Sequence, residues 1–405
     1  MIHVHRIPPC IDLDGALAPM KDLKNILEQG EDHVTEFKSS RFHNESLAKE
    51  VVAFSNSHGG SVFIGIEDDG AVSGIDDKTT EERVINICRN LIEPSVLPEI
   101  FFHQHTSGKK VLEVAIPKGL FKPYKIKGQN RFYVRVGTVS IEPSMPELIR
   151  LLQSGGLYHF EITSLPGAST ADLDWLRFRE YCQTYRKMEF EEHDARKLLE
   201  NWQLMDSHGQ MTVAGALFFA SNAERLLPQS GIQLFRFIGL DSTGAIADQK
   251  EILMPIPDSI DAAVKFVQFN SAVRGVFVDG NPRRIDVPDY DFFVIRELIT
   301  NAFCHRDWSI FGQKIRLSLF DDRLELFSPG ALPNTLTLEN ALAGVSFYRN
   351  PNIAQLCRDY GLVEKAGRGL QKIVAICRQL GLPQPQFQCD RTFIKTTVYN
   401  ASHTV

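Results

Sequence analysis

Three polar side chains in the C-terminal half are spaced so that they share one face of a predicted helix. Glu297, Asn301 and His305 follow one another at intervals of four residues, among apolar residues that recur at helical spacing. A carboxylate can orient and deprotonate a water molecule, and an amide oxygen is a ligand suited to Mg²⁺. The pattern therefore predicts a nucleotide-hydrolysis site with Mg²⁺; the alternative is an ordinary solvated helix face.

Glycines further along the chain are placed to hold the phosphates of a nucleotide. Gly330 follows a strand predicted over 323–327, and Gly367 and Gly369 stand at the start of a helix predicted over 369–380. Backbone N–H groups and the helix dipole favour a bound phosphate at such a place. A tight turn is the alternative for each glycine alone, but the ordered set is more specific for a nucleotide site.

A second group of charged side chains lies near the N-terminus. Glu36 and Lys38 alternate on a short extended segment, and Glu31 precedes them. Asp68 and Asp69 follow a buried strand predicted over 61–66, at the edge of the same sheet. Carboxylates that converge with a lysine can hold Mg²⁺ or Mn²⁺ and steady a water or a phosphate, as in metal-dependent phosphodiesterases. The alternative is a surface ion pair at Glu36 and a hairpin turn at 68–70.

Residues 109–135 form a basic stretch in an acidic chain. The stretch holds eight Lys or Arg and one Glu, whereas residues 1–99 hold 9 basic and 18 acidic residues and the whole chain has a net charge of −6. Basic side chains contact phosphates, and interleaved aromatic rings stack on unpaired bases. The predicted nucleic-acid contacts are Lys109, Lys110, Lys122, Tyr124, Lys125, Lys127, Arg131 and Arg135. The alternative is a solvated face with core aromatics.

The composition excludes several classes of protein. Among 405 residues, 43% are hydrophobic and 23% are charged, which is typical of globular domains. No apolar run approaches the roughly 20 residues that span a bilayer, and no signal peptide is readable, so we expect no membrane association. The seven cysteines are scattered without a C-x-x-C pair, which favours a reducing cytoplasm over a disulfide scaffold or a zinc site.

The elements that must position these groups suggest three parts. A helix over 44–57 and strands over 61–66 and 111–116 build the first part, and helices over 172–186 and 194–202 dominate the second. Strands and helices alternate again from residue 232, and Asp321-Asp322 joins two strands in a predicted hairpin. We therefore place domains at 1–158, 165–225 and 226–400, the middle one a winged-helix-like connector.

The N-terminal part resembles the Schlafen AlbA-type domain. The matching stretches are Glu31-x4-Glu36-Phe-Lys38, 53–60 (AFSNSHGG), 62–70 (VFIGIEDDG), 122–124 (KPY) and 132–137 (FYVRVG). In the nuclease members of that family, such a pair of glutamates, a lysine and a downstream aspartate form the catalytic centre. The resemblance implies these roles for Glu31, Glu36, Lys38 and Asp68, with Asp69 or Glu67 as alternatives for the aspartate. It supports nucleic-acid binding more firmly than cleavage.

Residues from about 170 to 390 resemble the ATP-binding half of the Schlafen-related transcriptional regulators, also described as RecG-like ATP-binding proteins. The matching stretches are 212–219 (TVAGALFF), 296–307 (RELITNAFCHRD), 322–325 (DRLE), 328–330 (SPG), 349–351 (RNP) and 361–369 (GLVEKAGRG). This half is similar to a divergent GHKL (Bergerat) ATPase, an α/β sandwich. The resemblance implies Glu297 as the water-activating base, Asn301 as the Mg²⁺ ligand, and Gly367 and Gly369 as phosphate contacts.

One position departs from the GHKL pattern. The usual strand ends in an Asp that reads the adenine amino group, and alignment of the loop prolines puts Phe327 there. The sequence therefore leaves open whether the site selects adenine and whether it hydrolyses the bound nucleotide. His305-Arg306-Asp307 is interpreted either as a structural hydrogen-bonded corner or as a phosphate contact.

We expect a multidomain α+β protein that acts on nucleic acid under the control of ATP and Mg²⁺. The first hypothesis is a metal-dependent RNA or DNA endonuclease, with phage defence as a setting and a homo-oligomeric state. The second is an ATP-binding transcriptional regulator that binds DNA without cutting it, and a third is a homo-oligomeric scaffold with an inactive nucleotide site. The sequence ends soon after the last ATPase motif, which favours action through the N-terminal domain.

Overall fold

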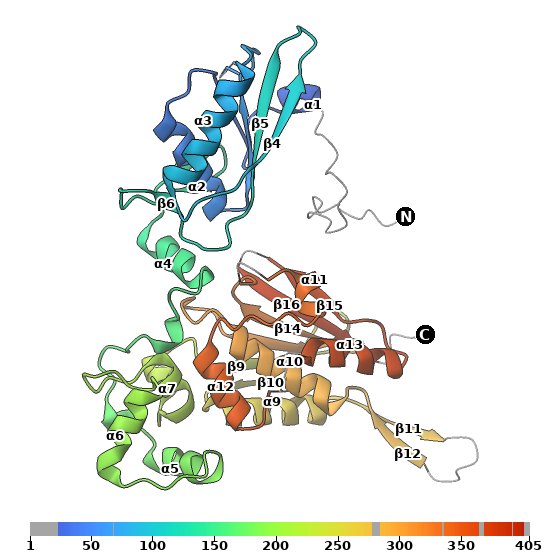
Figure 1. Ribbon diagram of the computed structural model, residues 1–405. Helices are drawn as coiled ribbons and strands as arrows, with labels where there is room; N and C mark the ends of the chain where they lie inside the picture. The colour runs from blue at the N-terminus through green and yellow to red at the C-terminus, as the bar shows by residue number, and fades with distance from the viewer. Residues whose placement is uncertain are drawn as a thin grey trace. The chain divides into compact units, whose positions relative to one another are not determined.

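A computed structural model describes residues 23–67, 69–277, 284–333, 336–363, 368–390 and 392–400 (Figure 1). The chain divides into two compact units, residues 1–155 and 156–405. Both units combine helices with sheets, so the predicted α+β multidomain class is confirmed. None of the described helices is long and apolar enough to cross a membrane.

The first unit is built on a four-stranded sheet with the strand order β1-β2-β5-β4. Strand β1 runs parallel to β2, and the other neighbours are antiparallel. The elements are α1 (Leu23–Gln29), β1 (Thr35–Lys38), α2 (Asn44–Asn56), β2 (Gly60–Ile64), α3 (Asp77–Asn90), β3 (Ile92–Glu93), β4 (Glu99–Gln104), β5 (Lys110–Ile116), β6 (Lys125–Ile126), β7 (Val134–Val136), β8 (Val139–Ile141) and α4 (Met145–Ser154).

The β-branched residues of β2 and β5 explain why the sheet is buried. Val62, Ile64 and Val114 are fully buried in one cluster with apolar residues of α2 and α3. Phe63 and Val111, which alternate with them along the strands, pack in a second cluster with residues of α1. Burial on both faces accounts for the apolar runs that identified these strands in the sequence.

The second unit is built on a six-stranded sheet with the order β10-β9-β13-β14-β16-β15. Strands β9 and β13 are parallel and the other neighbours are antiparallel. The elements are the 3₁₀ turns η1 (Phe160–Ile162) and η2 (Thr170–Asp172), followed by α5 (Trp175–Thr184), α6 (Glu192–Asn201), α7 (Val213–Phe219), α8 (Ala223–Leu226), β9 (Ile232–Phe237), β10 (Ile246–Ile252), α9 (Ile256–Asn270), β11 (Val273–Phe277), β12 (Arg284–Pro288), α10 (Phe292–His305), β13 (Ile315–Leu319), β14 (Arg323–Pro329), α11 (Leu338–Leu342), α12 (Pro351–Asp359), α13 (Gly369–Gln379), β15 (Gln386–Cys389) and β16 (Phe393–Tyr399).

The helical segment 165–225 shares one hydrophobic core with this sheet. Buried side chains of α5 and α7, such as Phe178 and Phe218, belong to the same cluster as Leu317 of β13 and Ile299 of α10. The predicted hairpin at Asp321-Asp322 is confirmed, because β13 and β14 pair antiparallel across it.

The segment directly after residue 155 is also tied into the second unit. Both carboxylate oxygens of Glu161 accept hydrogen bonds, one from the backbone N–H of Asn352 and one from that of Ile353, each at 2.7 Å. These are the first donors of α12, which would otherwise lack partners at the helix start. The Asn352 side chain in turn donates to the carbonyl of Trp202 at 2.9 Å, which links α12 to the helical segment.

Candidate functional site

Helix α10 positions the predicted Glu297, Asn301 and His305. Its start is fixed by Asp291, whose side chain accepts from the backbone N–H groups of Phe293 and Val294. Most of the apolar residues of the helix are buried, which holds its polar row in one orientation. All three predicted side chains line one pocket, and the structure therefore brings them together as the spacing predicted.

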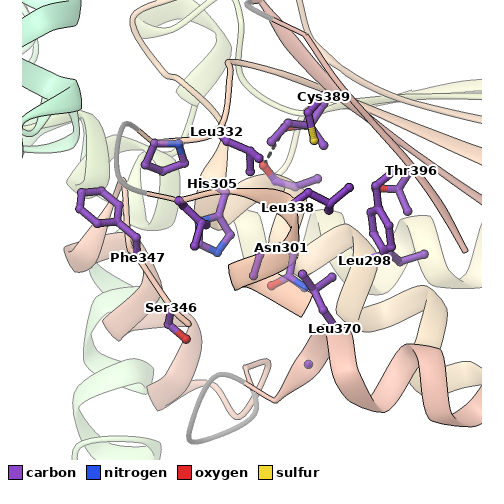
Figure 2. A pocket seen from close by; sticks show the side chains of 18 of the residues that line it. Leu298, Asn301, His305, Leu332, Leu338, Ser346, Phe347, Leu370, Cys389 and Thr396 are labelled. Atoms are coloured by element: carbon purple, nitrogen blue, oxygen red, sulfur yellow. Dashed lines mark hydrogen bonds between the residues drawn. The ribbon is translucent and has the colours of Figure 1, made fainter. Parts of the chain in front are cut away.

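The pocket lies between α10, strands β14 to β16, α11 and the start of α13. Figure 2 shows Asn301 near the middle of the view, with His305 and Phe347 to its left and Leu298 and Thr396 to its right. The remaining lining is mainly aliphatic, contributed by residues such as Leu326, Leu336, Leu370 and Ile394. Apolar walls with a few placed polar groups are typical of small-molecule sites.

Glu297 and Gly369 meet at this pocket. Glu297 is 3% exposed, and its Oε1 accepts a hydrogen bond of 3.2 Å from the amide of Asn301. A Cβ added to Gly369 would lie 1.8 Å from the same oxygen, so a larger residue at the start of α13 would have to displace the Glu297 carboxylate. The second predicted glycine, Gly367, lies outside the described residues. A carboxylate, an amide and a helix start thus meet at one point of the cavity.

Gly330 serves the shape of the loop after β14. Its φ of +116° belongs to the left-handed region, and an added Cβ would lie 2.7 Å from the Cβ of Asp307. Gly330 itself is not among the residues that line the pocket. Its conformation and its packing against Asp307 account for a glycine here, and its predicted cofactor contact stays a prediction.

Arg306 and Asp307 form a buried corner, the first of the two interpretations. The Arg306 guanidinium donates to the carbonyls of Asp307, Ile310 and Gln313, and Asp307 accepts from Arg349 at 2.9 Å. His305 lines the pocket beside them, where burial and the nearby Arg349 lower its pKa to about 4. His305 is therefore a neutral group at pH 7.

Phe327 faces away from the pocket. Its ring lies against Phe393 and under the guanidinium of Arg316, whereas its neighbours Leu326 and Ser328 line the cavity. The alternation of side chains along β14 explains this, because residues 326 and 328 share one face. The expectation that Phe327 stands at the base-reading position is corrected; the polar group at this point is the Ser328 hydroxyl, which also donates to the Ala302 carbonyl at 3.1 Å.

Arg349 and Tyr348 were missed as site residues. The Tyr348 ring lies parallel to His305 at the pocket, with 6.0 Å between ring centroids. Arg349 donates to Asp307 and to the carbonyl of Ala331, so it joins the two loops that border the cavity. The Arg349-Asn-Pro351 stretch was the available signal, but its partners lie in distant parts of the sequence.

The N-terminal charged group is organised around Arg135. One oxygen of Glu36 contacts Lys38, and the other lies 2.7 Å from the Arg135 guanidinium. Arg135 also pairs with Glu50 of α2 at 3.1 Å, and Glu50 is a residue that sequence reasoning missed. Burial is the main cause that raises the pKa of Glu50. Glu31 is exposed and accepts a hydrogen bond from the backbone N–H of Phe37 at 2.9 Å.

A divalent metal would have to compete with two cationic groups in this arrangement. Each oxygen of Glu36 already faces a cationic group, which would repel a second positive charge. Within the described ranges, no three His, Cys, Asp or Glu side chains are grouped so that they could hold a metal ion. Asp68, the remaining predicted ligand, lies outside those ranges.

The predicted basic stretch is divided by β5. Lys109 and Lys110 stand at the start of β5, and Lys125, Lys127 and Arg131 come after its end. The seven residues of β5 separate these places by about 20 Å at roughly 3.4 Å per residue.

Three of the predicted contacts are buried. Lys122, Tyr124 and Arg135 are 5%, 5% and 8% exposed, so the prediction of direct phosphate contacts is corrected for them. Lys122 donates instead to the carbonyl of Ser57 at 2.9 Å, and burial lowers its pKa to about 7.

Comparison with known proteins identifies two domains. Residues 31–144 match the domain described as "Schlafen, AlbA_2", and residues 312–398 match "Putative ATP-dependent DNA helicase recG C-terminal". The predicted fusion of a Schlafen AlbA-type domain with a RecG-like ATPase domain is thus confirmed. Together the two domains associate the chain with nucleic acid and with nucleotide binding. Helix α10, with Glu297 and Asn301, precedes the second matched range.

Two solved structures are similar to the chain. The crystal structure of the DIP2311 protein from Corynebacterium diphtheriae shares 21% identity over 93% of this chain and 79% of that chain, with a TM-score of 0.47. The solution structure of the N-terminal domain of a protein described as "Putative ATP-dependent DNA Helicase RecG-related Protein" from Nitrosomonas europaea shares 22% identity over 31% of this chain and 95% of that chain, with a TM-score of 0.25. No match was found among curated proteins.

Proposed function

We propose that this chain is a nucleic-acid-binding protein controlled by ATP, which binds with Mg²⁺ in the pocket of the second unit. The observation that carries the proposal is the meeting of Glu297, Asn301 and Gly369 at one cavity. The aliphatic walls can enclose a flat base, and the polar end can face phosphates.

The residues present fit a bound Mg²⁺ at this end of the pocket. Asn301 uses its amide N–H to contact Glu297, so its amide oxygen is the atom that would ligate the ion. When bound, Mg²⁺ would neutralise charge on the phosphate oxygens. Glu297 would orient and deprotonate the attacking water, and the neutral His305 would hold a polar contact without adding positive charge.

Thermal unfolding with and without ATP and Mg²⁺ tests the nucleotide site. Saturating nucleotide should raise the melting temperature of the wild type and leave that of Asn301→Ala unchanged. Asn86→Ala, at an exposed position of α3 in the other unit, should respond like the wild type. An equal shift in Asn301→Ala would overturn the assignment.

Binding is favoured over cleavage in the first unit because Glu36 is held by two cationic groups. Metal-dependent endonuclease activity is the second candidate, supported by the proximity of Glu36 and Lys38 on β1. Labelled transfer RNA, single-stranded RNA and duplex DNA should be incubated with Mg²⁺ or Mn²⁺, with and without ATP. Cleavage that disappears in Glu36→Ala would select the endonuclease. Binding without cleavage under every metal would select the regulator.

The homo-oligomeric state, the cytoplasmic location and the setting in phage defence stay predictions from the sequence.

A further inference from the structure

Two large apolar side chains are exposed on a loop of the first unit. Leu120 and Phe121 are 53% and 70% exposed, in the segment between β5 and β6. The ring of Phe121 therefore offers a large apolar surface to a ligand, whose contact would remove that surface from water.

The loop is fixed rather than loosely attached. The backbone N–H of Gly119 donates to the Ser55 carbonyl at 2.9 Å, and a Cβ on Gly119 would lie 2.2 Å from the Tyr124 ring. On the other side of the exposed pair, Tyr124 exchanges two hydrogen bonds with the Asn56 side chain, at 2.7 and 2.8 Å. Both ends are therefore anchored to the last turn of α2, and the ring is presented to solvent by a preorganised backbone.

The surroundings of Phe121 are basic. Residues 117–131 include five Lys or Arg and no Asp or Glu. Lys118 and Lys127 are exposed on either side of Phe121 in the sequence. Lys125 and Arg131 are also basic, but they pair with Glu93 at 3.6 Å and with Glu142 at 3.8 Å. Charge of this sign suits a phosphate backbone.

We propose that Phe121 is a stacking platform for an unpaired base, so that the first unit selects single-stranded over duplex nucleic acid. This inference rests on the proposed nucleic-acid function and names its substrate class. An aromatic face stacks on any base, and in a duplex the bases already stack on one another. Nearby lysines would contact phosphates of the same strand and supply the salt-dependent part of the affinity.

Fluorescence anisotropy of the full chain with a labelled oligouridine and with a duplex of equal length tests the proposal. Phe121→Ala should weaken binding of the single strand about fivefold or more, and leave its salt dependence unchanged. Lys127→Gln should instead reduce the salt dependence, because it removes a phosphate contact. Phe102→Ala is the matched control, since Phe102 is 40% exposed on β4 of the same unit.

Phe121→Trp supplies a second readout that does not depend on the loss of a side chain. It should keep the affinity of the wild type, and its fluorescence should be quenched when the oligouridine binds. The three native tryptophans, Trp175, Trp202 and Trp308, all lie in the second unit and give the background signal.

Four outcomes would overturn the inference. Unchanged single-strand affinity in Phe121→Ala excludes stacking, and a change of mass by light scattering in the same variant would show that the loop contacts a second protein chain instead. Equal losses for single strand and duplex would exclude the selectivity. If the wild type binds neither oligonucleotide, the proposed nucleic-acid function fails as well.

Discussion

Glu297 of the second unit and Glu36 of the first unit are both buried, at 3% and 6% exposure, but their surroundings differ. Glu297 contacts the neutral amide of Asn301 and the backbone at Gly369, and it lines a pocket. Glu36 lies between Lys38 and Arg135, and it does not line that pocket. The same residue type therefore meets an open cavity in one unit and a closed ion-pair network in the other.

This difference separates a group that can meet a ligand from one that stabilises the fold. A carboxylate whose oxygens both face cations has its charge balanced by the protein itself. A carboxylate beside a cavity can interact with water or a metal that enters the cavity. Glu161 is a third case, since its charge is met by the backbone N–H groups at the start of α12.

The largest expected effect concerns the closed network. Arg135→Met would leave Glu36 and Glu50 buried without their shared cation, and we expect a loss of about 3–5 kcal/mol in the free energy of unfolding. Circular dichroism during urea unfolding measures this loss. Arg131→Met, at an exposed arginine of the same segment, should change stability by less than about 0.5 kcal/mol. Equal stability of the two variants would show that the network contributes little.

The next effect tests Glu161 through its dependence on pH. Burial raises the pKa of Glu161 to about 7 from 4.5, so the folded chain binds this proton more tightly than the unfolded chain. The stabilisation is complete below about pH 4.5 and is lost as the pH rises through about 7, which amounts to about 3 kcal/mol. Glu161→Gln should remove this dependence. Urea unfolding followed by tryptophan fluorescence measures the free energy of unfolding at pH 5 and at pH 8. An equal difference between the two pH values in the wild type and in Glu161→Gln would contradict the assignment.

A smaller effect is expected at the open pocket. Gly369→Ala would push a methyl group into the Glu297 carboxylate, so we expect it to abolish nucleotide binding. The variant should then also lose the gain in the free energy of unfolding that ligand gives the wild type, which is about 2.7 kcal/mol at a ligand concentration of a hundred times Kd. Calorimetric titration with ATP and Mg²⁺ checks this. Gln371→Ala, at an exposed position of the same helix, should bind like the wild type; retained affinity in Gly369→Ala would move the phosphate site elsewhere.

The smallest effect tests the direction of Phe327. Because its ring lies against Phe393 on the face away from the pocket, Phe327→Leu should change nucleotide affinity by less than about twofold. The same titration measures it. A larger loss would mean that position 327 does contact the base and that the description of β14 is wrong.

Much of the second unit could be predicted because its signals are local. The four-residue spacing of Glu297, Asn301 and His305 is enough to place them on one face of a helix, and they do line one cavity. The direction of the Phe327 side chain could not be predicted from the loop alignment. It depends on which face of β14 packs against the helices and lines the pocket.

The first unit was harder to predict because its decisive contacts are distant in sequence. Arg135 is 85 residues from Glu50, and nothing in the local pattern distinguishes it from an exposed arginine. The basic stretch was visible from composition, but its division by β5 follows only from the position of that strand in the sheet.

The contact between Glu161 and α12 has a consequence for how the protein can be divided. The second domain match begins at residue 312, yet Glu161, the helical segment and α10 supply the cap of α12, part of the shared core and the polar row of the pocket. A fragment cut at the match would lack all of these groups, and a fragment cut at residue 226 would lack Glu161 and the helical segment. Neither fragment should fold. The range that matches the known domain is therefore much shorter than the part of the chain that folds together. A fragment that retains nucleotide binding should begin before residue 159.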